Sequence, residues 1–427
     1  MVANDNHSSA DLLISMIEFL LFCVAGSVLG IVAGLVPGLH VNNMVPFVMG
    51  LSLLVGDPHS LAVLVVSMAV SQVFASFIPS IFVGAPEADT SLSSLPGHRM
   101  LQEGRGLEAM RLTVIGGLCS LAISFLLIYF LSPHFRPFYD ISRPYIQYAL
   151  LGVIVFMVVS ERKMPRILSA SCIVLMSGLL GFIALNSPLS NQNSVLFPLL
   201  TGLFGISILV SSAVGGSNIS DQSSDGSFRS RKIDLIKSIV LGSVAGLVVG
   251  FLPAVGVSQA ATIFQQIGGL NDARTFLVSL SGINVANEVF SLNSVYLIDN
   301  PRSGASVAVE RILGDVTRDD LTLFSSAIAI SAGIGAAASL HISRFIPRII
   351  SRINYRNLSI AVALMLVSMI GLMTGPFGLL VAGAAVSVGM LCGRMGIRNG
   401  NCMGVLMVPS LFFFSGVSPD ALALLGV

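Results

Sequence analysis

Long apolar runs dominate this sequence and point to the lipid bilayer as its solvent. A transmembrane helix needs about 20 mostly apolar residues, and fewer where the helix is broken. Of the 427 residues, 54% are hydrophobic and only 10% are charged, too few to cover a water-soluble globule of this size. The runs fall at about 12–36, 60–85, 107–132, 145–160, 166–185, 195–214, 235–253, 275–299, 321–342, 357–374, 376–393 and 401–415. The sequence therefore predicts an all-α, polytopic membrane protein with about 12 spans.

Two shorter apolar segments are more polar than a free-standing span. They cover residues 41–56 and 257–270, and they follow Pro37 and Pro253 at the ends of long runs. Irregular backbone at membrane depth is stable only where protein buries it or where it lines a cavity. We therefore expect two re-entrant or broken half-helices in addition to the spans.

The two halves of the sequence contain the same glycine ladder. Its members are Gly26, Gly30, Gly34 and Pro37 and, 216 residues later, Gly242, Gly246, Gly250 and Pro253. Such a ladder gives a helix a flat face on which another backbone can approach closely. A stretch rich in Gly, Ser and charge, residues 215–234, separates the copies. The sequence predicts a first transmembrane repeat over 1–214, a cytoplasmic linker over 215–234 and a second transmembrane repeat over 235–427.

The positions of the basic residues indicate that the two copies are inverted. Cytoplasmic loops are enriched in Lys and Arg. In the first copy the loop 161–166 holds three basic residues and the loop 186–194 holds none. In the second copy the loop near 375 holds none, and the counterpart of 186–194 holds Arg394 and Arg398. Because the bias has changed sides, we predict two inverted repeats with both termini outside.

Polar residues after each ladder proline are the first candidates for a solute site. They are Gly38, Asn42 and Asn43 in the first copy, and Ser258 and Gln259 in the second. A half-helix that begins at such a break directs unsatisfied N–H groups and a partial positive charge toward it, which favours an anion. We predict that these residues bind the solute.

A second polar group occurs later in each copy. Its members are Pro86, Glu87, Asp89, Thr90 and Ser91 in the first copy, and Asn287, Glu288, Arg302 and Ser303 in the second. An intramembrane carboxylate is costly and offers either oxygen ligands for Na⁺ or a site for a proton, so Glu87, Asp89 and Glu288 are predicted to take part in ion coupling. The remaining residues are predicted to contact the solute, with Arg302 holding its carboxylate.

Structural roles are the alternative for these residues. The neutral side chains can equally form hydrogen bonds between helices, since lipid would leave their polar groups unpaired. Glu87 and Arg302 follow prolines at equivalent positions of the two copies. They either form an ion pair with each other, or act separately at the site, with Arg302 holding the solute carboxylate and Glu87 contributing to ion coupling, or are two solvated loop charges.

Catalysis is a weaker interpretation of the same residues. The segment from Gly256 to Gln259 superficially fits a serine motif of intramembrane proteases, but it corresponds to residues 40–43 of the first copy and is therefore a repeat feature. Zinc, ATP and dinucleotide motifs are absent, and the five cysteines stand singly without metal-ligand spacing. Balanced charge gives no signature of nucleic-acid binding. We predict no enzyme, no metal centre, no cofactor and no nucleic-acid partner, with an intramembrane hydrolase as the competing class.

Several of these motifs resemble the large membrane subunit of the tripartite tricarboxylate transporters. The segments that carry the resemblance are Gly30-x-x-x-Gly34-Leu35-Val36-Pro37-Gly38, Gly84-Ala85-Pro86-Glu87-Ala88-Asp89-Thr90-Ser91, Gly97-x-x-Met100-x-x-x-Gly104, Gly246-x-x-x-Gly250-Phe251-Leu252-Pro253, Asn287-Glu288 and Asn300-Pro301-Arg302-Ser303-Gly304-Ala305-Ser306. The resemblance implies a secondary transporter of carboxylates, driven by an ion gradient and served by an extracytoplasmic binding protein and a small membrane subunit. The chain departs from the family where Glu87 and Arg302 stand in place of the common glycine after proline. It is also shorter than typical members, and it resembles the more divergent, archaeal-type relatives.

The sequence thus predicts a secondary active transporter of small organic anions, with carboxylates as the expected solutes and alternating access around a midplane site. Na⁺ and H⁺ are both open as the coupling ion, and another small anion or a zwitterion is the alternative solute. The expected partners are the two subunits named above, the lipid of the cell membrane and, as an open option, a second copy of the chain. The first eleven residues contain no Lys or Arg, so no cleavable signal peptide is expected.

Overall fold

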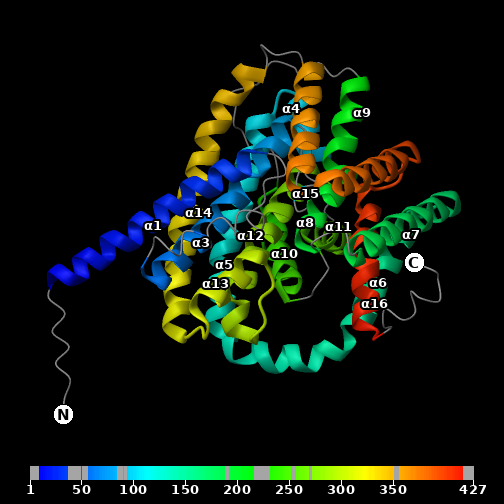
Figure 1. Cartoon of the computed structure of the whole chain (residues 1–427). Coiled ribbons are helices and arrows are strands. Elements are labelled where there is room, and N and C mark those ends of the chain that lie inside the picture. The colour runs from blue at the N-terminus through cyan, green and yellow to red at the C-terminus, as the bar shows by residue number, and fades with distance from the viewer. Residues whose placement is uncertain are drawn as a thin grey trace.

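A computed structural model describes residues 9–36, 50, 56–83, 90, 94–187, 192–215, 231–251, 256–268, 272–350 and 355–416 (Figure 1). All regular secondary structure in these ranges is helical. The first half contains α1 (Ser9–Leu35), α3 (Pro58–Ala75), α4 (Ser94–Gln102), α5 (Gly106–Ser142), α6 (Ile146–Val159), α7 (Met164–Asn186), α8 (Gln192–Leu200) and α9 (Ser207–Gly215). The second half contains α10 (Lys232–Phe251), α11 (Val257–Gly268), α12 (Ala273–Ile298), α13 (Gly304–Leu313), α14 (Arg318–Ile350), α15 (Tyr355–Arg394) and α16 (Gly404–Phe414).

Every predicted span corresponds to a helix in the described residues. Eight helical stretches are long and apolar enough to cross a membrane. Two of them, Gly106–Val159 and Ser359–Arg394, each cover two predicted spans, and the shorter apolar helices Val195–Ser211 and Asn399–Phe414 match the remaining two. The prediction of an all-α polytopic fold is confirmed at this level.

Helix boundaries differ from the prediction at two places. α5 continues through Pro133 and Pro137 to Ser142, although the apolar run ends near residue 132, and a 3₁₀ turn at Arg143–Tyr145 then joins it to α6. Prolines are tolerated in membrane helices because neighbouring groups satisfy the freed backbone carbonyls. The spans expected at 357–374 and 376–393 form one helical element, α15, broken at Gly375 by a positive φ of 66°.

The two short polar segments are only partly described. α11 covers most of 257–270 and has 12 residues, about 18 Å of helix, so it is too short to cross the roughly 30 Å hydrocarbon core alone. Of 41–56, only residues 50 and 56 are described, and 216–230 of the expected linker also lie outside the described residues. The domain boundaries and the re-entrant placement stay predictions.

Buried apolar side chains form two units, and each unit draws on both halves of the chain. The central unit contains α1, α3, α4, α5 and α10 to α14 around one continuous core. The peripheral unit contains α7, α8, α9, α15 and α16 around two smaller clusters. α6 contributes Ile146 and Leu150 to the first core and Met157 to the second. In Figure 1 the peripheral unit lies to the right of the central one.

The glycine ladders hold the centre of this arrangement together. α1 packs against α3, where a Cβ at Gly34 would lie 2.7 Å from Ala75 Cβ and 2.8 Å from Gln72 O. α10 packs against α12 in the same way, and a Cβ at Gly250 would lie 2.6 Å from Phe290 Cβ. Only glycine allows backbones to approach this closely, so the predicted flat helix faces are confirmed.

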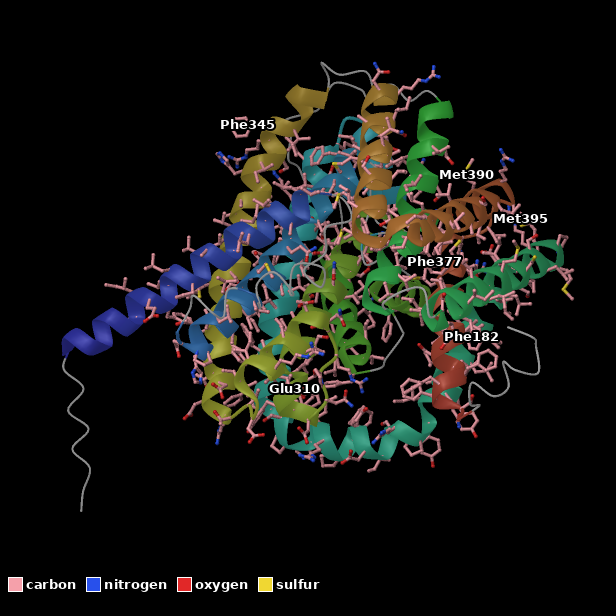
Figure 2. All side chains as sticks on the ribbon, in the orientation of Figure 1. Phe182, Glu310, Phe345, Phe377, Met390 and Met395 are labelled. Atoms are coloured by element: carbon pink, nitrogen blue, oxygen red, sulfur yellow. The ribbon has the colours of Figure 1, made fainter. Side chains whose placement is uncertain are left out.

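The packing partners repeat between the two halves. α14 contacts α3 and α1, and α5 contacts the corresponding α12 and α10. α5 runs from the upper part of Figure 1 to its lower edge, whereas α14 runs upward. Figure 2 agrees, because Glu310, on the helix before α14, lies near the lower edge and Phe345, late in α14, lies near the top. α5 and α14 therefore run in opposite directions in this orientation.

Candidate functional site

Five of the predicted site residues are described together with their side chains. They are Thr90, Asn287, Glu288, Arg302 and Ser303. Ser258 and Gln259 lie in α11, of which the backbone alone is described at these positions. Outside the described residues lie Gly38, Asn42, Asn43, Pro86, Glu87, Asp89 and Ser91.

The two ladder helices end beside the middle of two enclosed helices. α1 ends at Leu35, one residue after Gly34 contacts the Gln72 region of α3. α10 ends at Phe251, one residue after Gly250 contacts α12 at Asn287 and Phe290. The stretches that contain α3 and α12 are almost entirely buried by protein. The interruptions predicted after the two ladders fall at 37–49 and 252–255, outside the described residues, so they stay predictions.

Polar side chains of α12 gather at this level. Asn284 and Ser291 are buried, and Asn287 and Glu288 are half-buried on neighbouring turns. Asn287 corresponds to Ser71 and Glu288 to Gln72 at the displacement of 216 residues. Ser71 donates a hydrogen bond to Ser27 O of α1 at 3.0 Å, so in the first half this position joins two helices. The second half places an amide and a carboxylate there.

Thr90 belongs to the connection between α3 and α4. Its side chain is fully buried, and its carbonyl accepts a hydrogen bond from Ser80 Oγ at 3.2 Å. Ser80 lies in a π-helical turn, Pro79–Val83, that follows α3. π-helical turns are rare and occur frequently at functional sites. Thr90 is therefore held against an irregular part of the enclosed helix.

Arg302 has a cationic side chain without a carboxylate partner in the described residues. Its guanidinium carbon lies 4.9 Å from the centre of the Tyr139 ring, at the end of α5. Nε and one terminal nitrogen are buried and make no hydrogen bond. Burial lowers the pKa of Arg302, the charge of Arg143 acts in the same direction, and Tyr139 opposes them. The predicted contact of Arg302 with a solute carboxylate stays a prediction; such an anion would supply both a counter-charge and acceptors for these two nitrogens.

Ser303 positions Arg302. Its hydroxyl accepts from Ser306 N at 3.1 Å, and Ser306 Oγ accepts from the N–H groups of Ser303 at 2.7 Å and Arg302 at 2.8 Å. This capping box begins α13. The Ser303 hydroxyl thus caps α13, and its predicted direct contact with solute stays a prediction.

The predicted residues fall into two places. Asn287 and Glu288 lie in the middle of α12, whereas Arg302 and Ser303 follow its end at Ile298. Twelve residues separate Asn287 from Asp299, about 18 Å along a helix. Tyr139 and Asn300 adjoin Arg302, and the amide of Asn300 lies 3.5 Å from the Tyr139 hydroxyl. Sequence reasoning missed Tyr139, because it is 163 residues away along the chain and no motif contains it.

An all-helical chain with many helices that are long and apolar enough to cross a bilayer belongs to the class of polytopic membrane proteins. The chain is a member of the tripartite tricarboxylate transporter TctA family, which it matches over residues 20–404. This is a transporter family and not an enzyme family, so the chain is a membrane transporter component and the hydrolase alternative is set aside.

The sequence is similar to that of an archaeal protein. An uncharacterized protein of Methanocaldococcus jannaschii is 29% identical over 403 residues, which cover 92% of this chain and 98% of that protein. No solved structure matches the chain. The predicted family and its archaeal-type affinity are confirmed.

Proposed function

We propose that the protein is a secondary active transporter of small organic anions, with carboxylates as its solutes. The observation that carries the proposal is the half-buried guanidinium of Arg302, in which Nε and one terminal nitrogen are buried and have no hydrogen-bond acceptor in the described residues. The family is described as one of tricarboxylate transporters, which agrees with an anionic solute. Arg302 captures a carboxylate at the end of α12, and the interrupted helices form a second station near the midplane.

The midplane station combines residues from both halves. Gly38, Asn42, Asn43, Ser258 and Gln259 supply N–H groups and amides at the helix breaks, and Pro86, Thr90, Ser91 and Asn287 lie on the facing segments. Glu288, with Glu87 and Asp89, couples transport to Na⁺ or H⁺, because carboxylates at this depth either bind a cation or take up a proton. Access alternates between the two sides of the membrane around this station.

Partners and location follow from the same proposal. As in a tripartite system, an extracytoplasmic binding protein delivers the solute and a small membrane subunit accompanies this chain. The chain lies in the cell membrane, and a second copy is a further candidate partner. The opposite directions of α5 and α14, and their matched packing partners, support two inverted repeats.

Substitution of Arg302 tests the solute site. Loss of one charge-assisted contact costs about 1.5–3 kcal/mol, so Arg302→Gln should raise the apparent KM for carboxylate uptake about 10–100-fold. Arg302→Lys should recover part of the loss. Uptake by proteoliposomes, together with the rise in Tm on adding mono-, di- and tricarboxylates, measures the effect with Na⁺ or at varied pH.

Arg136→Gln is the matched control for this substitution. Arg136 is exposed and lies 3.7 Å from Asp299, so its loss should leave KM within about twofold. Normal uptake by Arg302→Gln would remove Arg302 from the solute path. A solute response confined to zwitterions or inorganic anions would replace the carboxylate assignment.

Accessibility of single cysteines tests the topology. Lys163 lies between α6 and α7, and Asn191 lies between α7 and α8. In a background without native cysteines, an impermeant thiol reagent applied outside should label Asn191→Cys and leave Lys163→Cys unlabelled. Permeabilised cells provide the control, since both positions should then react. Labelling of both positions in intact cells contradicts the inverted arrangement.

A further inference from the structure

A buried carboxylate ties α5 to α12 across the two halves. The side chain of Glu108, the third residue of α5, is 8% exposed. Its Oε1 accepts from Arg274 Nε at 2.7 Å, and its Oε2 accepts from Arg105 Nε at 2.8 Å. Arg274 is the second residue of α12, and it also lies 3.8 Å from Asp272, the N-cap residue of that helix. We name the contact between Arg274 and Glu108 the arginine tie.

A second buried carboxylate ties α3 to α14. The side chain of Asp320, the third residue of α14, is 8% exposed, and its Oδ1 lies 3.2 Å from His59 Nε2. The other oxygen of Asp320 accepts from the backbone and the hydroxyl of Thr317. His59 is the second residue of α3, and its Nδ1 lies 3.7 Å from Asp57, the N-cap residue of that helix. We name the contact between His59 and Asp320 the histidine tie.

The two ties occupy equivalent positions of the duplicated unit. In each, the cation is two residues after an aspartate N-cap, and its partner is the third residue of a helix from the other half. Glu108 and Asp320 are 212 residues apart, as are Arg99 and Arg311 in the preceding segments. The ties differ in the chemistry of the cation, because one half uses arginine and the other histidine.

That difference makes the ties respond differently to pH. Arginine stays charged at all physiological pH values, whereas histidine ordinarily changes its charge between about pH 5 and 8. Both ring nitrogens of His59 face a carboxylate, and a neutral imidazole can donate from only one of them. We propose that His59 and Asp320 form a proton-sensing site that holds α3 to α14 when His59 is protonated and weakens as pH rises.

The charged groups nearest to His59 in the described residues are the carboxylates of Asp57 and Asp320. Its side chain is 56% exposed, so solvent protons reach it. Other charged groups lie on the elements that pack against α3: Glu18 on α1, Glu310 and Arg311 on α13, Asp315 after it, Arg318 and Asp319 on α14, and Asp299 after α12. In the described residues, only Asp57 and Asp320 come within ion-pair distance of His59.

The two ties lie at opposite ends of the central unit. α5 begins in the upper part of Figure 1 and α14 begins near its lower edge. With the topology put forward under the proposed function, on which this step alone rests, the histidine tie faces the outside and the arginine tie faces the cytoplasm. The protein would then sense external pH at one face and keep a pH-independent contact at the other.

Exchanging the two cations tests the inference on the purified full-length protein, without any transport assay. The apparent Tm is measured from pH 5.5 to 8.5. Exposed pairs are weak, so the wild type should lose about 1–2 °C more across this range than His59→Arg, in which the tie stays charged. Arg274→His should make Tm fall more steeply with rising pH than in the wild type, because both ties then depend on a protonated histidine. His134→Gln, at an exposed histidine of α5, should keep the wild-type slope.

His59→Gln keeps the test decisive if Arg274→His does not fold. Like His59→Arg, it should remove the contribution of the histidine tie to the fall in Tm with rising pH. Unlike His59→Arg, it should lower Tm at pH 5.5, because glutamine carries no charge. If both His59 variants keep the wild-type pH slope, the histidine tie is not a proton-sensing site. Because solute plays no part in this measurement, its failure is separate from a failure of the solute assignment.

Discussion

Replacing Gly30 with leucine is expected to disrupt the packing of α1 on α3 and to lower the apparent Tm by about 3 °C or more. A Cβ at this position would collide with the carbonyl oxygen of Met68 and with Ser71 Oγ. A backbone carbonyl in the middle of an enclosed helix cannot move aside, so the cost should reach about 3 kcal/mol or more, the upper range for overpacking. Thermal denaturation of the purified protein measures the change.

Gly152→Leu is the matched control for this substitution. Gly152 lies within α6, and no atom stands within 4 Å of a Cβ built there. The same change in side-chain volume should therefore move Tm by less than about 2 °C. An equal loss in the two variants would mean that the effect comes from general intolerance to leucine and not from the contact between α1 and α3.

The ladder also shows why much of this fold could be predicted from the sequence. The length of an apolar run predicts a membrane helix, and small residues at i, i+4 spacing predict a close contact between helices. Gly26, Gly30 and Gly34 satisfied both conditions, and the structure places all three against α3. Local signals of this kind need no knowledge of the partner helix, which is why the predicted helix faces were correct.

Signals that depend on a distant partner could not be predicted in this way. Nothing in the sequence near Arg302 indicates that Tyr139 would lie under its guanidinium. The apolar run ends near residue 132, whereas α5 continues through Pro133 and Pro137 to Ser142. Each of these outcomes is decided by tertiary contacts, which satisfy groups that a local pattern leaves unpaired.

The exchange of helices between the two halves has a consequence for mechanism. Each half contributes helices to both the central unit and the peripheral unit, so neither unit can form from one copy alone. α6 contributes to both cores, next to the 3₁₀ turn Arg143–Tyr145. Under the proposed alternating access, relative movement of the two units would be carried by this connection.

Glu108→Ala is expected to be the most damaging single substitution of a charged residue at the cytoplasmic end of the proposed topology. The carboxylate of Glu108 is almost fully buried and accepts from two arginines on different elements. Removing one partner of a buried ion pair leaves its cations without compensation, which costs about 3 kcal/mol or more. Glu108→Gln should lose less than Glu108→Ala, because the amide oxygen still accepts a hydrogen bond.

An exposed ion pair nearby provides the comparison for Glu108. Arg99 and Glu103 lie 3.1 Å apart one turn from each other, with side chains 78% and 44% exposed. Surface pairs of this kind contribute about 0–1 kcal/mol, so Arg99→Ala should shift Tm by no more than about 1 °C, whereas Glu108→Ala should shift it by about 3 °C or more. Glu108 ties two helices from different halves, and Arg99 pairs within its own turn. Equal shifts for the two variants would show that burial and the contact between halves add nothing to the stability of the arginine tie.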